Sequence, residues 1–99
     1  MSERIHVVAS FAVSPESPAE FSALVNRLLV GPTQAEPGCI RYELCQDCAE
    51  PTSFVMLETW ASESDLDAHL AQPGLAAALD ELRPFVTAAP VVSRYRNSG

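Results

Sequence analysis

One segment of the sequence places a carboxylate among large apolar side chains at alternate positions: Phe54, Met56, Glu58 and Trp60. In a β-strand the side chains repeat with a period of two, so all four would share one face. Such neighbours make a buried charge costly, so Glu58 must be paired, protonated, or facing a hydrated pocket. Two interpretations stay open. Glu58 forms an ion pair with Arg41 or Arg94, or it has a raised pKa and orients a substrate hydroxyl or a histidine.

The best candidate for a general base is His69, three residues after Leu66 on the side of a short helical pattern expected to face inward. An imidazole ordinarily titrates near neutral pH, which suits proton transfer. A helical histidine can equally be a satisfied core or rim residue, and His6 is expected on a sheet face. Tyr42 could donate its hydroxyl to a ligand or simply pack. Trp60 could likewise be part of the core or a pocket wall.

Several kinds of site have no support in the sequence. The chain contains no lysine, which excludes a Schiff base on a lysine amine. It also lacks a glycine-rich nucleotide loop, an HExxH zinc motif and a GxSxG nucleophile motif. Cys45 and Cys48 have CxxC spacing, but no further zinc ligands are near in sequence and the pair falls where a hairpin should turn. We therefore expect no metal and no bound cofactor, with Cys39, Cys45 and Cys48 as incidental thiols.

Length and charge narrow the class of protein. The chain has 99 residues and a formal net charge of −7, and an acidic surface repels nucleic acid and anionic lipid. No stretch approaches the roughly 18 apolar residues of a membrane span, and the N-terminus has no signal-peptide pattern. We expect one cytoplasmic domain over residues 1–99, with its core in 5–96, that binds neither nucleic acid nor membrane.

The elements that must position these residues follow the order β-α-β-β-α-β. Strand patterns cover residues 5–13, 39–47, 54–61 and 91–96. The helical pattern that begins at Pro18 should kink or break at Gly31-Pro32. The second helical region begins with the capping-box spacing of residues 62–65, breaks at residues 72–74 and ends at Pro84. This order predicts an α+β fold, the ferredoxin-like split βαβ unit with an antiparallel sheet.

The predicted sheet is apolar on both faces. Val55 and Leu57 point away from the face that Phe54 and Met56 share. The helices can cover only one face, so the other predicts a homodimer.

Three segments, taken in order, resemble the antibiotic biosynthesis monooxygenase family: EPGC-x-x-Y at 36–42, E-x-W at 58–60 and LDAH at 66–69. The resemblance covers residues 5–96. It implies a dimeric α/β barrel with two sheets face to face and a pocket between sheet and helices in each subunit. Members include cofactor-free monooxygenases that oxidise quinols or polyketide anthrones with O₂. In that chemistry the deprotonated substrate supplies the electrons, and the protein binds, deprotonates and excludes water.

The resemblance also implies roles for individual residues. His69 would be the base, Glu58 would orient His69 or the substrate, and the pocket would be formed by Trp60, Phe54, Met56 and Tyr42. Haem-degrading members also resemble the chain at Trp60, but they ligate iron through a histidine in the second helical region. Residues 75–82 hold no histidine, with Leu79 near the expected place, and Ser10 stands near the place of an expected asparagine. Haem degradation is therefore disfavoured.

The leading hypothesis is a cofactor-independent monooxygenase that oxidises a quinol or related phenolic. One alternative is a non-oxidative isomerase of a small hydroxylated metabolite, which would use the same pocket without O₂. The other is a binding or stress-response dimer without catalysis, in which Glu58 and His69 satisfy each other. An open cavity with both groups at its wall would favour an enzyme.

Overall fold

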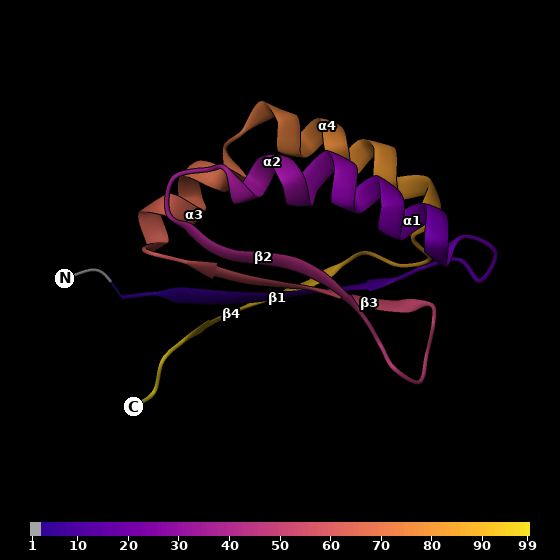
Figure 1. The fold of residues 1–99 in the computed structure, drawn as a ribbon, viewed down its shortest axis with the longest axis horizontal. Helices are drawn as coiled ribbons and strands as arrows, with labels where there is room; N and C mark the ends of the chain where they lie inside the picture. The colour runs from indigo at the N-terminus through magenta and orange to yellow at the C-terminus, as the bar shows by residue number, and fades with distance from the viewer. Residues whose placement is uncertain (1–2) are drawn as a thin grey trace.

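The computed structural model describes residues 3–99, with helices stacked on one face of a four-stranded sheet (Figure 1). The elements run in the order β1 (Ile5–Ala12), α1 (Pro18–Val25), the π-helical turn η1 (Asn26–Val30), α2 (Gly31–Gln34), β2 (Cys39–Gln46), β3 (Ser53–Trp60), α3 (Glu63–Leu70), α4 (Pro73–Leu82), the 3-10 turn η2 (Arg83–Phe85) and β4 (Val91–Arg96). The predicted α+β class and the β-α-β-β-α-β order are confirmed.

The strands lie in the order β2-β3-β1-β4, and every neighbouring pair is antiparallel. Their register aligns four residues across the whole sheet: Tyr42, Glu58, Val7 and Arg94. Residues opposite each other in neighbouring strands point to the same face, so these four side chains form one row. We call it the polar row, because three of its four members carry polar groups. It lies on the face that the helices cover.

The core lies between the sheet and the helices, and its largest fully buried side chains are Trp60, Phe21, Met56, Leu66 and Val25. Phe21 of α1 packs against Phe11 and Phe54, with ring centroids 5.7 and 5.2 Å apart. This aromatic cluster closes one end of the sheet. At the other end of the sheet, β3 ends at Trp60 and the chain enters α3. There Trp60 contacts two polar side chains, Glu58 and His69.

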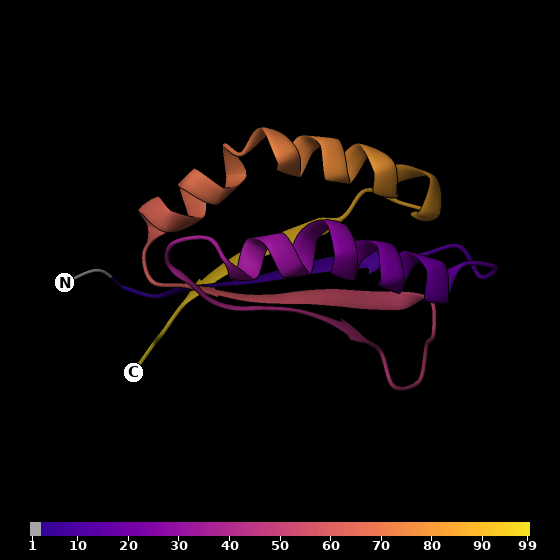
Figure 2. The ribbon, with the colours of Figure 1, turned by 45° about the horizontal axis from the view of Figure 1, so that its top comes forward.

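The disruption predicted at Gly31-Pro32 takes the form of the π-helical turn η1. Proline has no N–H to donate, and its ring clashes with the carbonyl four residues earlier in a regular helix. Here the N–H of Gly31 bonds the carbonyl of Asn26, five residues back, and α2 continues from there. The helical segment therefore continues from α1 to α2, and Figure 2 shows it beside α3 and α4 above the sheet. It ends just before Glu36.

The loop after α2 and the start of α3 are locked together. Gly38 has a φ of +79°, a left-handed conformation that favours glycine, and a Cβ there would collide with the carboxyl of Asp65. Ser62 caps α3 by accepting a hydrogen bond from the Asp65 N–H at 3.2 Å, as its spacing predicts. Two segments more than 20 residues apart are thus fixed against each other.

The opposite face of the sheet carries no helix in the described part of the chain (Figure 1). Val8, Val55 and Leu57 are only partly buried there. Val91 and Tyr95 of β4 are exposed. Within residues 3–99, none of the helices has the length and apolar content needed to cross a bilayer.

Candidate functional site

A cavity of about 310 Å³ lies between the helix-covered face of the sheet and helices α3 and α4. Its wall is mostly apolar, and the described residues that bring polar groups to it are Tyr42, Glu58, His69 and Arg94. Three of them belong to the polar row, and the fourth comes from α3 above it. The volume is at the low end of the range for small-molecule pockets, and a few converging polar groups in an apolar wall are typical of such sites.

His69 is buried, and its partner is Glu36. Its Nδ1 lies 2.9 Å from Oε1 of Glu36, in the loop between α2 and β2. An ionised carboxylate can only accept, so Nδ1 carries the proton and Nε2 is left to accept one. The pairing joins residues 33 positions apart in the sequence. Sequence reasoning assigned no role to Glu36, although it lies in the EPG segment that carried the family resemblance.

Two aromatic rings hold the imidazole in place. The ring centroid of His69 is 4.8 Å from that of Trp60, with the planes 31° apart, and 5.6 Å from that of Tyr42, at 65°. Tilted and edge-on packing at these distances restricts the tilt of the imidazole. With Glu36 fixing one ring nitrogen, the orientation of His69 is determined on three sides.

Glu58 is buried and accepts a hydrogen bond from Nε1 of Trp60 at 3.0 Å. Burial raises the pKa of this carboxyl, and the Trp60 hydrogen bond and nearby His69 oppose the rise. Glu58 makes no hydrogen bond to His69 among the described residues. The two groups face one cavity without satisfying each other.

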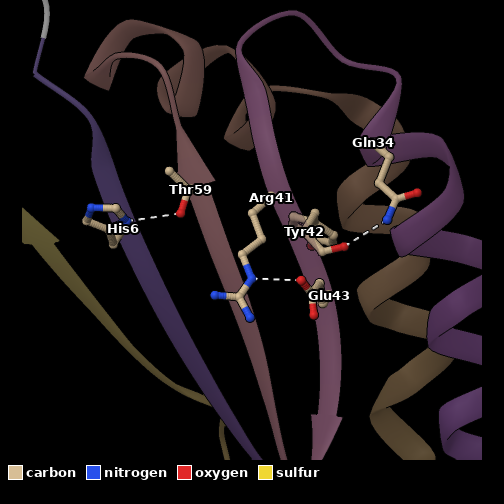
Figure 3. Close-up of polar contacts among 6 residues, drawn as sticks. All are labelled: His6, Gln34, Arg41, Tyr42, Glu43 and Thr59. Carbon is tan, nitrogen blue, oxygen red and sulfur yellow. Dashed lines mark hydrogen bonds and ion pairs between the residues drawn. The ribbon is translucent and has the colours of Figure 1, made fainter.

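The predicted ion pair of Glu58 with an arginine is not found in residues 3–99. Arg41 lies on the other face of the sheet and donates to Glu43 at 2.8 Å (Figure 3). Arg94 shares the polar row with Glu58, but Val7 lies between them in the register. Burial therefore disfavours the ionised form of Glu58, and within residues 3–99 no arginine pairs with the carboxylate to offset this cost.

Tyr42 stands beside Glu58 in the register and is buried at the cavity wall. Burial, and then the nearby Glu58 carboxyl, raise the pKa of its hydroxyl well above the ordinary value. The hydroxyl therefore stays protonated and can donate a hydrogen bond at any physiological pH. Gln34 donates to the Tyr42 carbonyl at 3.1 Å and ties β2 to the end of α2 (Figure 3).

The other residues predicted for the site divide into two groups. Met56 lines the cavity. Trp60 and Phe54 are not among its lining residues, since Trp60 lies behind Glu58 and His69 as their support, and Phe54 packs against Phe21. Whether any of them contacts a substrate stays a prediction.

A second cavity of about 260 Å³ lies on the far side of His69. It shares Leu29, His69 and Leu75 with the first cavity and adds Glu36 to its wall. His69 therefore borders both spaces, and Glu36 borders the second. No group of three or more metal-ligating side chains occurs in the described portion of the chain.

Residues 4–81 match the family model described as antibiotic biosynthesis monooxygenase. A curated protein from Synechocystis sp. is 36% identical over 69 residues, which is 70% of this chain and 46% of that protein. The chain thus spans about half the length of the curated relative that it matches.

Solved structures with the same fold include a conserved Methanosarcina mazei protein, with a TM-score of 0.90 and 31% identity over 97% of this chain and 94% of the other. A Caulobacter crescentus protein described as a candidate antibiotic biosynthesis monooxygenase has a TM-score of 0.88 and 30% identity, covering 99% and 92% of the two chains. SnoaB of Streptomyces nogalater, a cofactor-independent oxygenase, is similar in fold alone, with a TM-score of 0.86 and 22% identity over 99% and 96%.

Proposed function

The chain belongs to the antibiotic biosynthesis monooxygenase family, and from this premise we propose that it is a cofactor-independent monooxygenase that oxidises a quinol or related phenolic with O₂. One observation carries the proposal. A buried histidine, oriented by the Glu36 carboxylate, lies at the wall of a mostly apolar cavity of small-molecule size. This arrangement suits removal of a proton from a small aromatic substrate in a space that excludes water.

The first step is deprotonation. Nε2 of His69 takes the proton of a phenolic hydroxyl, or of an acidic C–H beside a carbonyl, and the substrate becomes an electron-rich anion. The Glu36 carboxylate stabilises the imidazolium that forms, through the charge-assisted hydrogen bond at Nδ1. Such bonds contribute about 1.5–3 kcal/mol, which corresponds to roughly ten- to a hundredfold in rate.

The second step is reduction of O₂ by the substrate anion. For a quinol, one ring C–H becomes C–OH and the quinol becomes a quinone; for an anthrone, the ring CH₂ becomes C=O. In both cases one oxygen atom enters the product and the other leaves as water. The substrate supplies all four electrons, and the balance needs no other reductant. The Tyr42 hydroxyl, neutral because burial raises its pKa, can donate to the substrate oxygen as negative charge develops there. Glu58, in its protonated form, can return a proton to reduced oxygen.

The open cavity favours an enzyme over a binding protein without catalysis. In the latter, Glu58 and His69 would satisfy each other, whereas each has a different partner and both face the cavity. The isomerase alternative uses the same base and cavity, but it consumes no O₂. O₂ consumption therefore separates the two.

The test is O₂ uptake measured with an electrode over a panel of hydroquinones and anthrones, with autoxidation subtracted. We expect enzyme-dependent uptake that falls on the order of a hundredfold or more in His69→Ala, because the general base is lost. His6→Ala is the matched control, since His6 points to the uncovered face and bonds Thr59. Absence of uptake across the panel, from protein with an intact circular dichroism spectrum, would refute the monooxygenase assignment.

We also propose that the protein is a homodimer joined through the uncovered face of the sheet. That face is apolar at Val8, Val55 and Leu57, and no other part of residues 3–99 covers it.

A further inference from the structure

We propose that Arg94 selects the substrate by binding a carboxylate, so that the substrate is an aromatic hydroxy acid. The inference rests on the proposed function for the reacting hydroxyl, and adds an acidic group at the other end of the molecule. Arg94 lies on β4 in the polar row and lines the cavity. Of the described residues that line the cavity, it alone carries a fixed positive charge.

Arg94 lies at the mouth of the cavity. Its side chain is 44% exposed, whereas Glu58 and His69 are buried. Three apolar side chains that line the same cavity are exposed as well: Leu70, Leu79 and Val92. The mouth thus combines one guanidinium with a rim of apolar surface, a composition that suits a molecule with an aromatic body and a single anionic group.

The guanidinium is held only loosely by the protein. Its nearest carboxylates are Glu63 and Asp67 on α3, with Nη1 to oxygen distances of 3.7 and 3.8 Å, beyond hydrogen-bond length. Two other arginines bond their partners tightly, since Arg41 and Arg83 both lie 2.8 Å from a carboxylate oxygen. In residues 3–99 no hydrogen bond occupies the Arg94 side chain. Its N–H groups can therefore turn onto an incoming carboxylate, which a guanidinium binds with two parallel hydrogen bonds.

The register sets the length of the ligand. Arg94 and Glu58 are separated by β1, hence by two strand spacings, or roughly 9–10 Å between their Cα atoms. A carboxylate on Arg94 places the ring of a compact aromatic acid over Val7 and its far hydroxyl toward Glu58 and His69. Both ends of such a molecule would then meet a polar group at the same time.

The surrounding charge favours a monoanion. Glu63 and Asp67 stay within 4 Å of the guanidinium, and the chain as a whole has a net charge of −7. A phosphate, with nearly two negative charges, would be repelled more strongly by these carboxylates than a carboxylate would. We therefore assign the anionic group as a carboxylate.

The experiment compares binding of (2,5-dihydroxyphenyl)acetate with that of its methyl ester, by calorimetry without O₂. Wild type should bind the acid on the order of tenfold more tightly, because a charge-assisted pair forms only with the acid. Arg94→Gln should lose this preference while keeping its affinity for the ester. Arg41→Gln, which alters an arginine on the other face, should behave as wild type. Higher salt should weaken binding of the acid alone.

Three results would overturn the inference: equal affinity of wild type for acid and ester, a preference that survives in Arg94→Gln, or no binding of either compound. Thermal melting of Arg94→Gln checks that the fold is intact. Because binding is measured without O₂, the outcome is independent of turnover. Binding of the acid through Arg94 without O₂ uptake would refute only the proposed function. Uptake with neutral quinols but no preference for the acid would refute only the role of Arg94.

Discussion

At the scale of single residues, the chemistry of this site depends on which carboxylate meets the imidazole. His69 is oriented by Glu36 at 2.9 Å, while Glu58 bonds Trp60 at 3.0 Å. The two carboxylates thus have different hydrogen-bond partners, and the partners suit them to different roles in proton transfer. Glu36 can stabilise a cation, and Glu58, whose pKa is raised by burial, is the better proton donor.

We expect Glu36→Gln to lower kcat by roughly ten- to a hundredfold with little change in KM, because the amide can still accept from Nδ1 but cannot stabilise imidazolium as a charge does. The measurement is steady-state O₂ uptake across a pH series, since a change in the pH profile follows only if Glu36 acts through His69. Glu43→Gln is the matched control, with its carboxylate on Arg41 at the opposite face. A rise in KM at unchanged kcat and an unchanged pH profile would contradict the role.

Glu58 should make stability depend on pH in a defined direction. Burial raises its pKa in the folded state above that in the unfolded chain. As pH rises, the unfolded chain therefore releases this proton first, and the native state loses stability until the folded pKa is passed. Glu58→Gln removes this penalty and keeps an oxygen for Trp60 Nε1.

From acid to neutral pH, the free energy of unfolding of wild type should therefore fall relative to that of Glu58→Gln. Urea titrations at several pH values measure it. A difference that does not change with pH would mean that Glu58 ionises in the folded protein as it does in the unfolded chain.

At the scale of elements, the strands and helices were predictable from the sequence, whereas the contacts between them were not. Alternation and helical spacing depend on neighbours a few positions apart, which is why all four strands and the Ser62 cap were found. The Glu36–His69 pair joins the loop between α2 and β2 to helix α3, across 33 positions of the sequence. No local pattern encodes such a pair. The expected ion pair between Glu58 and Arg41 was wrong, because Tyr42, not Arg41, lies opposite Glu58, and Arg41 lies opposite Thr59 on the other face of the sheet.

The close contact between Gly38 and Asp65 holds the loop that carries Glu36 against α3. Gly38→Ala should destabilise the protein by about 1–3 kcal/mol, because alanine resists a φ of +79° and its Cβ would strike Asp65. It should also lower kcat, since Glu36 and His69 lie on the two segments that the contact joins.

Gly74→Ala supplies the control. Nothing lies within 4 Å of its added Cβ, and the position is in the first turn of α4, so stability should stay equal or rise by a few tenths of a kcal/mol. Denaturant unfolding of both variants is the measurement. Equal stability of Gly38→Ala and Gly74→Ala would show that the close contact of Gly38 with Asp65 does not stabilise the fold.

At the scale of the whole molecule, the sequence predicted best the features that depend on the order of the elements and motifs along the chain. The family and the ferredoxin-like fold follow from element order and three motifs in sequence, and both are confirmed. The resemblance implied a pocket between sheet and helices, but its size and its lining could not be predicted, because they depend on how far α3 and α4 stand from the sheet. That distance is set by the packing of many side chains together.

The proposed dimer depends on two opposing features, the apolar uncovered face of the sheet and the net negative charge of each chain. Leu57→Asp places a charge in the middle of the uncovered face, where Leu57 is only partly buried in the single chain. We expect this variant to be monomeric in sedimentation velocity at micromolar concentration while it keeps its fold, and wild type to be dimeric. Ala77→Asp, on the exposed side of α4, is the control and should stay dimeric.

Salt provides a second and independent test of the same interface. Each chain carries −7, so association brings like charges together, and it must be driven by the apolar face. Added salt screens this repulsion without weakening apolar burial. The wild-type dimer should therefore tighten as salt rises, with a lower dissociation constant at high ionic strength. A dimer that weakens with salt would be held by ion pairs, and one that persists in Leu57→Asp would use a different surface.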